Sequence, residues 1–191
     1  NKAALPDKYA QGPITAESCH WSSQPINFDH RDYSASIRLA GWAALVLDPI
    51  IIDGYHFTRV LMDGCSSLNL IYRDTIRKMG IDPMKICHSN TTLKGVTPGP
   101  GAHCMGSLLL EVIFSSPNNF RSENLTFYIA PFKCGYQALL GREAFARFNA
   151  IPHYASLTLK MPGPRGIITV NGNIERSLRA EESAAALAAA H

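Results

Sequence analysis

Residues 60–72 read VLMDGCSSLNLIY, and this stretch decides the fold that the sequence predicts. Three apolar residues lead into Asp63, after which Gly64, Cys65 and two serines precede a second apolar run. A carboxylate at the end of a buried strand is costly unless it is paired or takes part in chemistry. Asp63 is therefore either a turn residue that caps the following loop or a catalytic group.

Strand and helix patterns surround this stretch. Residues 42–64 contain two apolar, β-branched runs separated by Asp53-Gly54, a pair that suits a tight hairpin because glycine accepts positive φ. Residues 67–72 (SLNLIY) predict another strand. Residues 73–80 (RDTIRKMG) predict a helix with Ile76 and Met79 on one face and Gly80 as its C-cap.

The second half of the chain continues this alternation of short elements. Residues 91–114 carry four glycines and two prolines between strand-like flanks, which predicts a long hairpin. Residues 125–131 and 137–141 predict strands, and residues 142–150 predict a helix through the apolar spacing of Phe145 and Phe148. Residues 155–172 predict a closing hairpin with a Pro-Gly-Pro turn.

These elements predict a mainly β fold, a small barrel or sandwich-like domain with short helices. We expect residues 1–35 to be an irregular leader, residues 36–172 to be the folded domain, and the Ala-rich residues 173–191 to be a helical or disordered tail. At 191 residues the chain has room for one sizeable core.

Composition limits the classes of function. The net charge of +3 is small and the Lys and Arg residues are scattered, so we expect no direct nucleic-acid binding and no membrane partner. Apolar runs stay far below the ~20 residues of a membrane-spanning helix, and the polar start lacks a signal-peptide core, which favours an intracellular location. The five widely spaced cysteines favour reduced thiols.

Other chemical motifs are weak. Cys87-His88 and His103-Cys104 fit no common zinc spacing, so we expect no metal and no cofactor. Cys65 as a nucleophile would need a base such as His56, but no motif orients that pair. From the residues alone, Asp63 could hold or activate a water, but peptide hydrolysis needs both a base for the water and an acid for the leaving nitrogen. Two-fold dimerisation would supply a second copy of Asp63.

Residues 58–81, the Gly- and Pro-rich hairpin and residues 137–172 together resemble the protease region of plant gypsy-type retrotransposon polyproteins, which are retropepsin-like aspartic proteases. The resemblance runs from about Asp29 to Gly172, and its parts occur in the family's order. It combines an apolar-apolar-Asp-Gly-x-Ser motif, a flap-like hairpin and an apolar-Leu-Gly-Arg motif before a helix.

The resemblance implies a retropepsin-like closed β barrel, a homodimer, a polypeptide substrate and catalysis by Asp63 on a loop formed by Gly64, Cys65 and Ser66. It implies a flap over the substrate that includes Gly95, Val96, Gly99 and Gly101. It also implies that a second-half segment supports the active-site loop from beneath, namely Leu139, Leu140, Gly141 and Arg142.

The chain departs from the usual family motif, in which Thr or Ser and then Gly follow the aspartate. Gly64 lacks the hydroxyl that would hydrogen-bond across the dimer, although the plant group often reads Asp-Gly-Gly-Ser. Cys65 would be strained if its position required positive φ. A second hypothesis therefore stays open, in which a catalytically degenerate retropepsin fold acts as a dimerisation or peptide-binding module.

Overall fold

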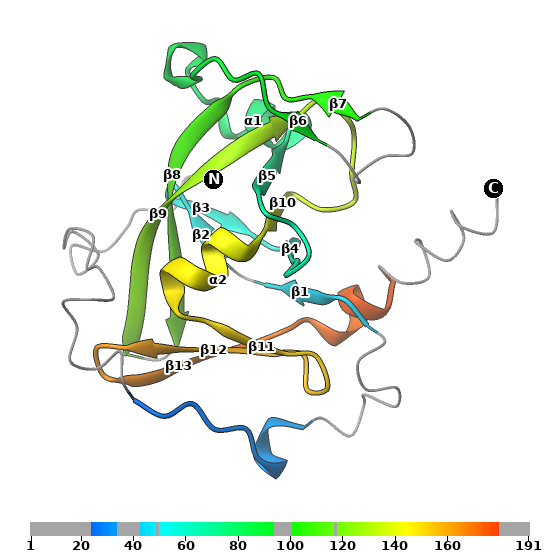
Figure 1. Ribbon diagram of the computed structural model, residues 1–191. Helices are drawn as coiled ribbons and strands as arrows, with labels where there is room; N and C mark the ends of the chain where they lie inside the picture. Colours follow the sequence, from blue (N-terminus) through cyan, green and yellow to red (C-terminus); the bar gives the residue numbers. More distant parts are fainter. Residues whose placement is uncertain (1–23, 34–42, 49, 94–100, 117, 180–191) are drawn as a thin grey trace.

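The chain folds around a strongly curled β-sheet, seen in a computed structural model that describes residues 24–33, 43–48, 50–93, 101–116 and 118–179 (Figure 1). The strands of this sheet are β1 (Leu45–Leu47), β2 (Ile50–Ile52), β3 (Tyr55–Phe57), β4 (Val60–Met62), β5 (Asn69–Tyr72), β8 (Ser107–Ser116), β9 (Asn119–Ala130) and β10 (Ala138–Leu140). They lie in the order β1-β4-β10-β5-β9-β8-β2-β3. The predicted mainly β class is confirmed, with the main sheet curled into a half-barrel.

Smaller elements complete the fold. One further sheet consists of β11 (Ile151–His153), β12 (Thr158–Gly163) and β13 (Gly166–Asn171), and another of β6 (Thr92–Leu93) and β7 (Ala102–His103). The helices are α1 (Arg73–Met79) and α2 (Arg142–Phe148), with single 3-10 turns at His30–Asp32 and Pro83–Lys85. Residues 174–179 are also helical. The described helices are short, so strand pairing dominates the architecture.

Local sequence signals explain several of these elements. Asp53 and Gly54 take φ of 47° and 78°, as a two-residue hairpin turn between β2 and β3 requires. Helix α1 ends at Gly80 in the left-handed conformation, and Ile76 and Met79 are buried on its inner face. Both features are confirmed as predicted, because turn and cap chemistry depend on nearest neighbours in the chain.

In α2, the predicted apolar face is uneven. Phe148 is fully buried, whereas Phe145 is partly buried at the edge of the core. The helix ends at Asn149, which takes the left-handed conformation with φ of 48°. The predicted helix is confirmed, and one of its two phenylalanines carries most of the packing.

The predicted hairpin across residues 91–114 is described at its base and in its second half. Among the described residues, Thr92–Leu93 pair with Ala102–His103, while the apolar run of β8 pairs with β9 along its whole length. Alternate residues of β8 are buried, which suits one face of a long antiparallel ladder against the core. The chain turns between the two ladders at Gly106, where φ is 131°.

Strands β5 and β10 are buried on both faces, which explains why their sequences are apolar except for Asn69. Ile71 and Leu140 belong to the main core beneath the sheet. Leu70 and Leu139 belong to a second, smaller cluster that also contains Leu93 from β6. The second cluster thereby anchors the base of the β6–β7 hairpin to the strands that flank Asp63.

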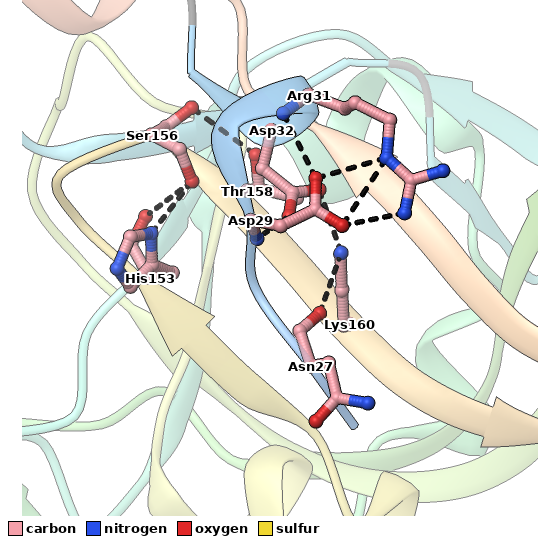
Figure 2. Close-up of polar contacts among 8 residues, drawn as sticks. All are labelled: Asn27, Asp29, Arg31, Asp32, His153, Ser156, Thr158 and Lys160. Atoms are coloured by element: carbon pink, nitrogen blue, oxygen red, sulfur yellow. Dashed lines mark hydrogen bonds and ion pairs between the residues drawn. The ribbon is translucent and has the colours of Figure 1, made fainter. Parts of the chain in front are cut away.

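Residues 24–33 pack against β11 and β12 (Figure 2). Lys160 forms an ion pair of 2.6 Å with Asp32 and donates a hydrogen bond of 2.8 Å to the carbonyl of Asn27. Phe28 stacks on His153 with ring centroids 4.5 Å apart. This part of the predicted leader is therefore docked on the domain.

The predicted tail also begins in contact with the domain. Ser177 is fully buried, and its hydroxyl accepts a hydrogen bond of 3.3 Å from the backbone N–H of Val46 in β1. Arg176 forms an ion pair of 2.6 Å with Asp48. The helical expectation holds for residues 174–179, and the proposed division into leader, domain and tail stays a prediction.

Candidate functional site

Asp63 follows β4 directly and is half-buried. Its backbone N–H donates a hydrogen bond of 2.9 Å to the carbonyl of Leu140, which continues the β4–β10 ladder by one residue. The carboxylate Oδ1 accepts a hydrogen bond of 2.9 Å from the N–H of Cys65. Among the described residues, nothing donates a hydrogen bond to Oδ2. One carboxylate oxygen is thus held by the loop, and the other accepts no hydrogen bond from the described residues.

The two positions after Asp63 are exposed and unstrained. Cys65 is not among the described residues with positive φ, so the strain considered for this position does not arise. A Cβ at Gly64 would meet only the ring of Phe145, at 4.0 Å, which is ordinary van der Waals contact. The loop therefore reaches its path without a glycine at position 65, and position 64 has room for a side chain.

Ser66 closes the loop. Its N–H donates to the carbonyl of Asp63 at 3.2 Å, and its hydroxyl donates to the carbonyl of Leu68 at 2.8 Å. Its own carbonyl accepts a hydrogen bond of 2.9 Å from the N–H of Arg142. The Arg142 guanidinium adds a contact of 3.3 Å to the carbonyl of Cys65. The loop and helix α2 are thus joined by both the backbone and the side chain of Arg142.

Gly141 lies directly against the loop, at the junction between β10 and α2. A Cβ there would lie 2.4 Å from the carbonyl oxygen of Leu68 and 2.7 Å from that of Ser66. Such distances do not occur between real Cβ and oxygen atoms, so glycine is required by close backbone approach. The backbone at Gly141 therefore packs directly against the Asp63 loop, and a supporting role for the whole segment 139–142 stays a prediction.

Asn69 is a site residue that the sequence analysis missed. It is fully buried, and its Oδ1 accepts a hydrogen bond of 2.9 Å from the N–H of Gly141. Its Nδ2 donates to Glu143 at 2.8 Å and to the carbonyl of Thr126 at 3.1 Å. The sequence feature that could have revealed it is a polar residue inside the apolar run LNLIY. A polar side chain is tolerated in a core only when its hydrogen bonds are satisfied.

Tyr154 is the second residue that the sequence did not reveal. It lies in the turn between β11 and β12, and its phenol accepts a hydrogen bond from the backbone of Gly64. Burial raises the pKa of Tyr154 above its ordinary value, and the nearby charges of Asp63 and Cys65 act in the same direction, whereas the Gly64 hydrogen bond opposes them. The three-stranded sheet therefore reaches the Asp63 loop.

A cavity of about 220 Å³ separates this loop from the base of the β6–β7 hairpin. The cavity is lined by Cys65, Ser66, Ser67, Leu68, Leu70, Thr92 and Leu93. Of the predicted flap residues, Gly95, Val96 and Gly99 lie outside the described residues, and Gly101 has φ of 88° at the start of β7. The pairing of β6 with β7 supports a hairpin beside the site, and its role as a cover stays a prediction.

Alternative chemistries find no support in the geometry of the described residues. In these ranges no three His, Cys, Asp or Glu side chains converge on a position that could hold a metal ion. The four cysteines of the described segments, Cys65, Cys87, Cys104 and Cys134, are all free. No helix within the described part of the chain is long and apolar enough to cross a membrane.

Comparison with known proteins gives a likeness in structure but not in sequence. No family model matches the chain, and no curated protein matches it. One similar solved structure is the retroviral protease-like domain of Ddi1 from Leishmania major, with 13% identity, a TM-score of 0.48, and coverage of 69% of this chain and 95% of that one. Another is a retropepsin-like aspartic protease from Rickettsia conorii, with 12% identity, a TM-score of 0.42, and coverage of 68% and 90%. Both neighbours are retropepsin-like.

Proposed function

We propose that this protein is an aspartic-type endopeptidase of the retropepsin type, derived from a plant gypsy-type retrotransposon and suited to polyprotein processing. The observation that carries the proposal is the state of Asp63. One carboxylate oxygen is held by the loop, the other accepts no hydrogen bond within the described part of the chain, and a cavity adjoins the loop. The sequence order of motif, hairpin and apolar-Leu-Gly-Arg segment supports the same assignment.

The chemistry requires two carboxylates. In a homodimer related by a two-fold axis, Asp63 from each copy would approach the axis. Like charges about 3 Å apart cannot both ionise, so the pair would share one proton. The ionised partner would take a proton from the attacking water, and the protonated partner would donate to the peptide that is cleaved. The Cys65 N–H would orient each carboxylate for this exchange.

The direct test is an assay of the full chain on a set of unstructured polypeptides at about pH 5, where a shared-proton dyad is expected to work. Asp63→Asn is the matched control, because the amide keeps the shape and loses the charge. We expect cleavage by the parent chain and its loss in Asp63→Asn. Equal rates in the two proteins would exclude catalysis by Asp63.

A second measurement separates the dimer from the chemistry. Sedimentation equilibrium of parent and Asp63→Asn should give dimers in both cases. The variant Cys65→Gly should change the cleavage rate little, because Cys65 has no positive φ to relieve. A large gain in rate would instead show that Cys65 impairs the active site, as expected for a decayed enzyme.

The alternative is a dimerisation or peptide-binding module without hydrolysis. Gly64 favours it, since this residue has no hydroxyl to join the two loops across a dimer. An extended peptide could still lie between Leu68, Leu70 and Leu93, which line the cavity. A dimeric protein that binds the test polypeptides without cutting them would establish this alternative.

A further inference from the structure

A second cavity, of about 240 Å³, opens between β3, α1 and the loop that precedes β10. None of its lining residues belongs to the loop that follows Asp63 or to the cavity beside that loop. The proposed protease chemistry makes no use of it. Its lining combines aromatic rings with a group of cations.

The walls of this cavity are tied together by hydrogen bonds. The Tyr55 hydroxyl donates to the carbonyl of Met79 at 2.6 Å, which joins β3 to the end of α1. The side-chain oxygen of Gln137 accepts from the N–H groups of Thr58 and Arg59 at 2.8 Å and 3.0 Å, which joins the same region to the loop before β10. The cavity is therefore formed before any ligand arrives.

Positive charge dominates the lining. Arg59, Lys78 and Lys133 face the cavity, together with a single carboxylate, that of Asp74. The Oδ1 atom of Asp74 already lies 3.9 Å from Nε of Arg73 and 3.9 Å from Nη1 of Arg77. Within the described ranges, no ion pair involves any of the three lining cations. Three cations around a small preformed hollow attract an anion of more than one charge.

Aromatic side chains form the rest of the wall. Tyr72 is buried and lines the cavity beside Tyr136 and Cys134. Burial raises the pKa of the Tyr72 phenol, and its hydrogen bond with Cys134 acts in the same direction, so this hydroxyl stays protonated. The rings of Tyr72 and Tyr136 offer a surface for a planar apolar group.

We propose that this cavity binds a small phosphomonoester with an aromatic body. Arg59, Lys78 and Lys133 hold the dianionic phosphate, and the organic group lies against Tyr72 and Tyr136. The guanidinium of Arg59 suits two phosphate oxygens at once, while each lysine acts as a point charge. This site stands independently of the role of Asp63.

Calorimetric titration of the full chain with phenyl phosphate tests the proposal, with inorganic phosphate and the uncharged benzyl alcohol as companion probes. The substitutions Arg59→Gln and Lys133→Gln should each weaken the affinity for phenyl phosphate about tenfold, as expected for a lost charge-assisted contact. The matched control Lys85→Gln removes an exposed cation outside the cavity and should leave the affinity unchanged. Benzyl alcohol should not bind, and inorganic phosphate should bind more weakly than phenyl phosphate.

Alkylation supplies an independent readout. Cys134 lines the cavity and Cys65 lies elsewhere, and both thiols are exposed. Phenyl phosphate should slow the reaction of iodoacetamide with Cys134 and leave Cys65 unaffected, as followed by peptide mass spectrometry. Absence of saturable phenyl phosphate binding, or equal affinity in parent and Arg59→Gln, would overturn the site. Equal affinity for inorganic phosphate and phenyl phosphate would overturn the proposal that the ligand has an aromatic body, and would make free phosphate the occupant.

Discussion

The substitution Gly141→Ala tests whether the Asp63 loop depends on close backbone packing. Gly141 has φ of −94° and ψ of −165°, a conformation open to alanine, so any cost must come from steric contact. The added Cβ would start 2.4 Å from the Leu68 oxygen and 2.7 Å from the Ser66 oxygen. Both obstacles are backbone atoms of the loop, which move only if the loop itself moves.

The magnitude follows from this geometry. Overpacking a close-packed site costs about 1–3 kcal/mol, and we expect the upper end because no flexible side chain can yield. Alanine also reduces the conformational freedom of the unfolded chain, which offsets about 0.4–1 kcal/mol of this cost. A net loss of about 2 kcal/mol lowers the melting temperature by about 4–8 °C for a chain of this size. The rate of peptide cleavage should fall even under conditions in which the variant stays folded, because the displaced loop carries Asp63.

Urea unfolding and peptide cleavage measure the two effects, and two glycine variants serve as controls. A Cβ at Gly135 meets nothing within 4 Å, so Gly135→Ala should change the free energy of unfolding by less than about 0.5 kcal/mol. Gly64→Ala tests the loop itself, since its Cβ contacts only Phe145 at 4.0 Å. Identical unfolding midpoints for Gly141→Ala and Gly135→Ala would refute the packing argument.

Two further predictions concern buried or docked polar groups. Asn69→Leu leaves the N–H of Gly141 without its partner and should lower the free energy of unfolding by about 2–3 kcal/mol, while Asn124→Leu on the exposed face of β9 serves as its control. An effect no larger than that of the control would contradict the role of Asn69. The hydrogen bond and charge of Lys160 hold the pKa of Asp32 below its usual 3.8. The ionised Asp32 therefore stabilises the docked residues 24–33 at pH values above 3.8. This stabilisation is lost as the pH falls through the lowered pKa of Asp32. Thermal melts between neutral and acid pH should therefore show a smaller acid-induced loss in Asp32→Asn than in the parent, and parallel losses would exclude the linkage.

Local patterns carried much of the fold. The Asp53-Gly54 turn, the Gly80 cap and the strand ending at Asp63 could be predicted because each depends on backbone preferences within a few residues. The segment QALLG was recognisable as a buried strand, and the family resemblance predicted that it supports the Asp63 loop from beneath. Its position between β4 and β5 is a long-range pairing that no local preference encodes.

Other features needed the assembled fold. Strand β8 pairs with β9 and not within the predicted hairpin, because the long ladder buries one whole face of both strands. Asn69 joins the strand after the Asp63 loop to Gly141, which lies 72 residues further along the chain, and Tyr154 comes to the loop from a turn far away in the sequence. The group of Arg59, Lys78 and Lys133 arises from three separate segments.

The sequence by itself determined that the chain is mainly β, that a carboxylate ends a buried strand, and which turns and helix caps surround it. These properties depend on periodicity and on residues with restricted or permissive backbones. Only the tertiary structure decided that Cys65 is unstrained, that Gly141 must be glycine, and that one oxygen of Asp63 is held by the Cys65 N–H. These properties depend on distances between segments that are remote along the chain, and such distances exist only once the sheet has curled and packed.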